Sequence, residues 1–68
     1  MKASWTRLDD GSWGVRLECA PWPQGTGVGL PVTVKSRAGV SKSVVLGEHV
    51  RMFRVAGGRF VDIYRVEV

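Results

Sequence analysis

Hydrophobic residues alternate with polar ones in five stretches of this chain, and turn-forming residues separate these stretches at regular spacing. An alternation with a period of two is typical of half-buried β-strands, and no long window shows the 3.6-residue period of a helix. The pattern predicts strands over residues 4–8, 12–18, 30–36, 41–55 and 59–68. A chain of 68 residues has room for one small domain, so we expect residues 1–68 to fold as a single unit.

Glycines mark the places where this sheet is expected to turn or bend. Asp10-Gly11 predicts a tight hairpin, because this pair readily adopts the positive φ angles of such turns. Gly14, in the middle of the second strand, predicts a bulge or the close approach of another backbone. Gly47 is expected to bend the long fourth strand. Five short strands, one of them bent, indicate an all-β fold: a small, five-stranded, SH3-like or OB-like barrel that is partly open.

The alternation also predicts which side chains enter the core of this barrel. Trp13, Val15 and Leu17 share one face of the second strand, and we expect that face to point inward. In the third strand the same reasoning places Val32 and Val34 inside.

The other aromatic residues divide between the core and the surface in this prediction. A chain this small needs most of its aromatic side chains for packing, so we expect two of Phe53, Phe60 and Tyr64 to be buried. Trp5 and Trp22 are the aromatic residues expected to be exposed. For the last strand the pattern does not decide which face is buried. The candidates are Phe60, Tyr64 and Val66 on one face and Val61 and Ile63 on the other.

Positive charge is concentrated in the second half of the chain. The formal net charge is +4, and residues 1–34 contain as many acidic as basic side chains, so the excess lies after residue 34. Seven of the ten cations are arginine, whose planar guanidinium suits phosphate groups and base stacking. This asymmetry indicates a polyanionic partner, although a net charge of this size also serves ordinary solubility.

No combination of residues points to catalysis, to a cofactor or to a metal site. Cys19 and His49 are the only thiol and imidazole. A single cysteine excludes an internal disulfide, and one cysteine and one histidine are too few to form a four-ligand metal site. Asp9 and Asp10 lie in a turn, where aspartate is favoured for local hydrogen bonds. We therefore expect a protein that is not an enzyme. The start of the chain lacks a signal-peptide pattern, and no apolar run is long enough for a membrane span, so we expect a cytoplasmic location.

Basic and aromatic side chains together indicate nucleic-acid binding, because proteins that bind single strands combine cations for the backbone with aromatic platforms for the bases. The cations predicted to neutralise phosphates are Arg37, Lys42, Arg51, Arg54 and Arg59, and the predicted stacking residue is Trp22 or Trp5. Two alternatives remain: a module that binds a host or phage protein, and a small subunit that self-associates as a homo-oligomer.

One resemblance spans about residues 5–66. The stretch Asp10-Gly11-Ser12-Trp13-Gly14-Val15-Arg16 is followed by Val32-Thr33-Val34 and by Arg37, Gly39, Lys42, Val44 and Gly47. This pattern resembles a small Trp/Gly-rich β-domain of actinobacterial and actinobacteriophage proteins. The chain departs from it in a longer loop around Trp22 and in Leu30-Pro31 before the third strand. The resemblance implies a phage or actinobacterial origin, hence action in the cytoplasm of a bacterial host, and it implies no particular activity.

Overall fold

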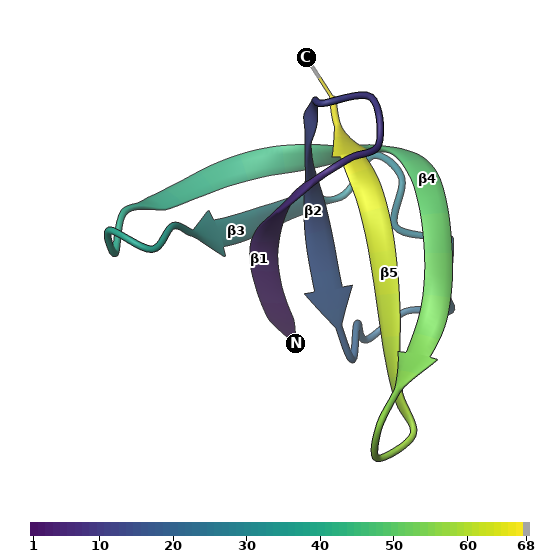
Figure 1. Cartoon of the computed structure of the whole chain (residues 1–68). Coiled ribbons are helices and arrows are strands. Elements are labelled where there is room, and N and C mark those ends of the chain that lie inside the picture. The colour runs from purple at the N-terminus through teal and green to yellow at the C-terminus, as the bar shows by residue number, and fades with distance from the viewer. Residues whose placement is uncertain (68) are drawn as a thin grey trace.

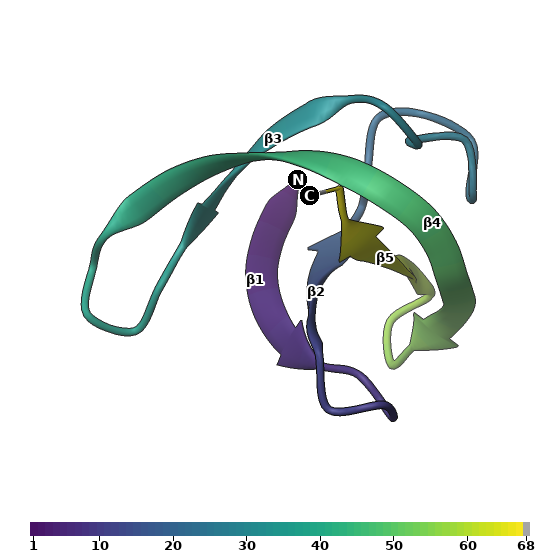
Figure 2. The same cartoon turned by 90° about the horizontal axis from the view of Figure 1, so that it is seen from above.

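The computed structural model describes residues 1–67, and within that range it contains five antiparallel strands and no helix. They are β1 (Lys2–Arg7), β2 (Trp13–Glu18), β3 (Pro31–Lys35), β4 (Ser41–Val55) and β5 (Arg59–Val66). The strands follow the order β1-β2-β5-β4-β3 and curl into a nearly closed barrel (Figures 1 and 2). The all-β prediction is confirmed: β4 has the predicted bounds, and the other strands differ by at most two residues at the ends described. The predicted last residue of the fifth strand, 68, lies outside the described range.

The long strand β4 belongs to two ladders. Its first part, Ser41–Val45, pairs with β3, and the part from Leu46 onward pairs with β5. The β4–β5 register shifts twice between Leu46 and Arg51, and Figure 2 shows β4 arching over the barrel at its middle. These shifts confirm the predicted bend near Gly47, where a Cβ atom would lie 3.2 Å from the carbonyl oxygen of Arg65.

The hairpin made of β3 and the first part of β4 extends away from the rest of the sheet (Figure 1). We call residues 31–45 the arm. Its end is a three-residue loop, Arg37–Gly39, closed by hydrogen bonds from Ser36 N to Val40 O at 2.9 Å and from Gly39 N to Ser36 O at 3.0 Å. The loop Asp9–Gly11 between β1 and β2 is built in the same way, and φ of Gly11 is 85°. The predicted turn at Asp10-Gly11 is therefore present as a three-residue loop.

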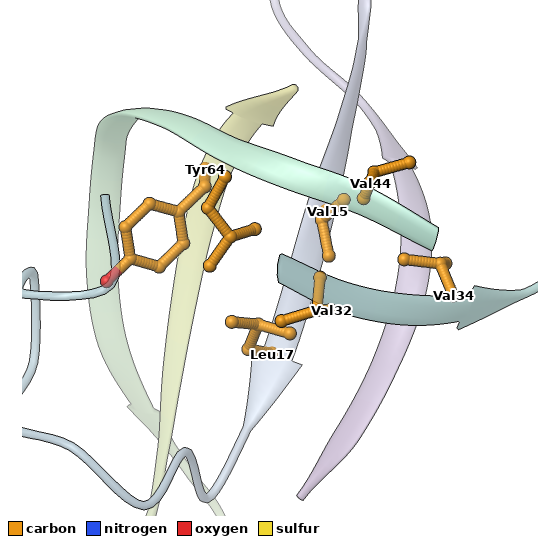
Figure 3. Packing of buried hydrophobic residues seen from close by; sticks show 7 residues of the cluster. Val15, Leu17, Val32, Val34, Val44 and Tyr64 are labelled. Atoms are coloured by element: carbon orange, nitrogen blue, oxygen red, sulfur yellow. The ribbon is translucent and has the colours of Figure 1, made fainter. Parts of the chain in front are cut away.

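The main core lies inside the curled sheet. It consists of seven buried residues: Val15, Leu17, Val32, Val34, Val44, Leu46 and Tyr64 (Figure 3). All four valine and leucine residues predicted to point inward in β2 and β3 are among them. Each fully buried aliphatic side chain contributes about 1.5–3 kcal/mol relative to exposure.

A second, smaller cluster lies on the opposite side of β5. It contains Leu8, Val61 and Ile63, with Val50 and Val55 packed against it. Tyr64 faces the main core while Val61 and Ile63 enter this second cluster, so β5 is buried on both faces over residues 61–64. Both faces of the last strand therefore contribute buried side chains.

Gly14 is the point where β2 and β5 approach most closely in this part of the sheet. A Cβ atom at Gly14 would lie 2.7 Å from the carbonyl oxygen of Tyr64 and 2.8 Å from a methyl carbon of Leu8. The predicted close approach of another backbone is therefore confirmed.

Three expectations about aromatic residues are wrong. Trp13 is 53% exposed, because it is the first residue of β2 and forms the last pair of the β1–β2 ladder with Arg7. Of Phe53, Phe60 and Tyr64 only Tyr64 is buried. Trp5 and Trp22 are half-buried rather than exposed, since both pack against the main core.

Candidate functional site

The arm overhangs the β1–β2 end of the barrel and encloses a groove of about 1000 Å³ on that side. The groove has an aromatic wall from β1 and β2, a wall from the arm, and residues at the end of β5. It is lined by Trp5, Trp13, Ser36, Arg37, Lys42, Ser43, Val44, Val45, Val66 and Glu67. We call this feature the arm groove. Its volume is at the upper end of the range found for ligand sites in proteins.

The aromatic wall is formed by Trp5 and Trp13, which project from the same face of neighbouring strands. Trp13 is opposite Arg7 in the β1–β2 ladder, and the guanidinium carbon of Arg7 lies 4.5 Å from the centre of the Trp13 ring. Arg7 also donates a hydrogen bond to the carbonyl oxygen of Gly11 at 3.2 Å. One face of the Trp13 ring is thus held against a cation that is itself anchored to the turn.

The arm wall is basic. Lys42 is opposite Val34 in the β3–β4 ladder, so it lies on the core face of the arm, and Arg37 belongs to the loop at the end of the arm. Lys35 is opposite Ser41, on the other face. Residues 31–45 contain these three cations and no acidic residue. Among residues 1–67, none of the three has a carboxylate oxygen within 4 Å, although the acidic residue Glu67 also lines the groove.

Three of the other four cations of the second half pair with carboxylates of the molecule, and the fourth, Arg54, contacts an aromatic ring instead. Arg51 pairs with Asp9 at 3.2 Å, and Arg59 lies 3.5 Å from Glu18. Arg65 donates to the carboxylates of Asp10 at 2.8 Å and Glu48 at 3.1 Å. Arg54 lies 4.3 Å from the centre of the Phe60 ring. These interactions leave the arm as the part of the second half with the clearest excess of charge.

Two of these acidic groups have lowered pKa values, mainly because of hydrogen bonds from Ser12 and from Arg16. The pKa of Asp10 lies well below its usual value, chiefly because the side chain and backbone of Ser12 donate hydrogen bonds to it and because Arg65 adds a further one. The hydrogen bond from Arg16 likewise lowers the pKa of Glu18. Both carboxylates therefore remain charged at neutral pH.

The predicted binding residues consequently separate into two groups. Trp5, Arg37 and Lys42 meet at the arm groove. The predicted cations Arg51, Arg54 and Arg59 lie outside the groove, on the second part of β4 and the start of β5, and Trp22 lies in the loop between β2 and β3. The arm groove thus brings together two of the five predicted cations, Arg37 and Lys42.

Trp22 borders a smaller pocket of about 370 Å³ together with Phe60 and Asp62. The Trp22 indole packs on Gly27, where a Cβ atom would lie 2.7 Å from Nε1. That indole nitrogen is buried and has no hydrogen-bond partner among residues 1–67. Trp22 thus serves as part of the packing that holds its loop on the barrel.

Buried polar groups of β5 secure the same loop. The Tyr64 hydroxyl accepts a hydrogen bond from the Gly27 amide at 2.9 Å, and Figure 3 shows the hydroxyl directed at the loop. The Asp62 carboxylate lies 3.1 Å from His49 Nε2 and accepts a longer hydrogen bond, 3.4 Å, from the Gly25 amide. The only imidazole is therefore engaged with Asp62, in a contact that supports the loop.

Cys19 is exposed and has a φ angle of 55°. Residues 1–67 hold no group of three or more His, Cys, Asp or Glu side chains placed to bind a metal ion. The same range has no helix long and apolar enough to cross a membrane.

Sequence reasoning missed two residues at this site: Trp13, which lines the arm groove, and Arg7, which packs on the Trp13 ring. Both flank the Asp9–Gly11 loop, and a hairpin closed by that loop places them opposite each other. The position of the turn therefore predicts that Arg7 and Trp13 lie opposite each other. The alternation of β2, however, predicts a core position for Trp13.

Comparison of the chain with protein-family models, with curated proteins and with solved structures gives no match. The resemblance to a Trp/Gly-rich β-domain, and the likeness to SH3-like or OB-like barrels, stay predictions.

Proposed function

We propose that this protein is a non-enzymatic nucleic-acid-binding module whose contact surface is the arm groove. The observation that carries the proposal is that Arg37 and Lys42, which form no ion pair within residues 1–67, line the same groove as Trp5 and Trp13. Cations that approach phosphate groups release counterions and dominate the affinity for nucleic acids. Aromatic rings beside them provide surfaces for bases.

Internal ion pairing supports the choice of this surface over the rest of the molecule. The guanidinium groups of Arg51 and Arg59 already contact carboxylates, so part of their charge is compensated before a phosphate approaches. Arg37 and Lys42 have no such competitor within residues 1–67. A phosphate at the arm therefore gains charge compensation without breaking an existing pair.

The proposal is tested by measuring the affinity for labelled single-stranded and duplex oligonucleotides at several salt concentrations. Each phosphate contact contributes a slope of about −0.7 for single strands and −0.9 for duplexes to log K against log salt. The double variant Arg37→Gln/Lys42→Gln should therefore bind more weakly and show a slope shallower by about 1.4 to 1.8.

The matched control is Arg51→Gln/Arg59→Gln, which removes the same two charges from the paired cations. This control should retain most of the affinity and a slope close to that of the unaltered protein. Equal losses of affinity in the two double variants would mean that net charge alone drives binding. A salt slope of zero for the unaltered protein would show that binding involves no phosphate contacts.

A second candidate function is supported by the edges of the sheet. β1 and β3 are the two end strands; they lie against each other, and no ladder joins them within residues 1–67. Their outer edges thus lack a ladder partner within residues 1–67, and an extended segment of another protein that enters between them would supply one. Capture from a nuclease-treated host lysate, with hydrogen exchange slowed at the edge amides of β1 or β3, would support this function. Loss of the captured partner after nuclease treatment would contradict it.

A further inference from the structure

We infer that the arm groove takes an unpaired base, stacked on Trp13, so that its ligand is single-stranded rather than duplex nucleic acid. This inference rests on the proposed function and adds the class of ligand to it.

The first step concerns the Trp13 ring itself. A tryptophan that is 53% exposed leaves a large apolar surface in contact with water, and such a surface gains from being covered by a partner. Arg7 covers one face of the ring, at 4.5 Å, and Arg7 does not line the groove whereas Trp13 does. We therefore assign the remaining ring face to the groove side.

The second step concerns the rigidity of this platform. Trp13 and Arg7 occupy opposite positions in the β1–β2 ladder, next to a loop closed by two backbone hydrogen bonds. Arg7 is also tied to the carbonyl oxygen of Gly11. A ring held in this way loses little conformational freedom when a base stacks on it, which favours binding.

The third step distinguishes single strands from duplexes. In a duplex the faces of the bases are stacked on their neighbours, and only their edges are accessible in the grooves. A tryptophan ring face at the wall of a groove can therefore stack only on a base that is unpaired or displaced. The backbone of the same strand would lie toward Arg37 and Lys42 on the arm wall.

The arm offers a competing geometry, because a two-stranded ribbon fits the major groove of a duplex. In that arrangement the arm would enter the nucleic acid and Trp13 would remain outside the contact. The two geometries therefore predict opposite effects of changing Trp13.

The experiment compares Trp13→Ala with Phe53→Ala, which truncates an exposed aromatic residue outside the groove. A labelled single-stranded oligonucleotide and the matching duplex are titrated at one low salt concentration, after circular dichroism has confirmed that the variants are folded. We expect the unaltered protein to prefer the single strand. Trp13→Ala should weaken single-strand binding by about 5- to 150-fold, the range measured for loss of one stacked base, with the salt slope unchanged.

Trp13→Tyr keeps an aromatic ring and provides a second test if the alanine variant fails to fold. It should recover most of the affinity, and the quenching of tryptophan emission by the oligonucleotide should be smaller than in the unaltered protein. Phe53→Ala should bind like the unaltered protein.

The possible failures are distinguishable. The stacking inference is overturned if the duplex binds as tightly as the single strand or more tightly, or if Trp13→Ala keeps full affinity. In either case the proposed function still stands if binding depends on Arg37 and Lys42. Absence of binding to both oligonucleotides overturns the two proposals together.

Discussion

Asp10 illustrates how much one residue contributes to this small fold. One of its carboxylate oxygens accepts hydrogen bonds from the backbone and side chain of Ser12, and the other accepts one from Arg65 at 2.8 Å. The same side chain therefore shapes the Asp9–Gly11 loop and ties that loop to the end of β5. These contacts favour the charged form and explain the lowered pKa of Asp10.

The variant Asp10→Asn should reveal this contribution through its dependence on pH. Because the pKa of Asp10 is lower in the folded than in the unfolded protein, its stabilising effect is fully present above the unfolded value of about 4. The effect is lost as the pH falls from there through the folded pKa. We expect Asp10→Asn to be less stable than the unaltered protein at pH 7, by a difference that stays constant to about pH 5 and shrinks below pH 4.

Urea denaturation of both proteins between pH 7 and pH 2 measures that difference. Asp9→Asn is a suitable control, because the Asp9 side chain is 94% exposed and contacts only Arg51 among the cations of residues 1–67. Its effect on stability should be smaller throughout. A difference for Asp10→Asn that does not change with pH would contradict the prediction.

At the scale of elements, the loop between β2 and β3 depends on side chains of β5. Twelve residues lie between Glu18 and Pro31, and they contain no strand of their own. Tyr64 and Asp62 provide hydrogen bonds to the amides of Gly27 and Gly25, while Trp22 packs against the main core. The loop is thus held by a few specific contacts instead of by a ladder.

Tyr64→Phe should loosen this loop while leaving the ring in the core. The substitution removes the acceptor of the buried Gly27 amide, and an unsatisfied buried donor costs about 1–3 kcal/mol. We expect a loss of stability in that range and faster hydrogen exchange at Gly27, measured by nuclear magnetic resonance. The amide of Leu17 provides the reference, since β2 is the central partner of β1 and β5. Unchanged exchange at Gly27 would mean that packing of Trp22 alone holds the loop.

At the scale of the whole molecule, noncovalent interactions alone stabilise the fold. Cys19 is the single cysteine, so no internal disulfide assists the fold. The hydrophobic residues are divided between two clusters, one on each side of β5, which makes this strand central to both. A domain of this length has a free energy of unfolding of about 3–10 kcal/mol.

Against so small a total, truncation of one core residue should have a large effect. Leu17 is fully buried, and Leu17→Ala should lower the free energy of unfolding by about 2–5 kcal/mol. Leu30→Ala removes the same atoms from a side chain that is 39% exposed, and its effect should be clearly smaller. Urea denaturation followed by tryptophan fluorescence measures both. Equal losses would show that the burial of Leu17 in the main core is not what stabilises the fold.

The sequence by itself determined the strands, the turns and the inward face of β2 and β3. These features depend on local alternation and on the backbone preferences of residues such as Gly11, which act before any distant contact forms. Val15 and Leu17 were assigned correctly for this reason. Of the candidate site, sequence reasoning supplied Trp5, Arg37 and Lys42, because charge and aromatic character are visible without a fold.

Only the tertiary structure decided which of these residues meet. Alternation of hydrophobic and polar residues tells which side chains share a face of a strand. It does not tell whether the rest of the fold covers that face at a given position, and for this reason the core position predicted for Trp13 is wrong. The register of distant strands likewise determines ion pairs such as Arg51 with Asp9, which are 42 residues apart. Such pairs, invisible in the sequence, compensate Arg51, Arg59 and Arg65, whereas the arm cations have no carboxylate within 4 Å among residues 1–67.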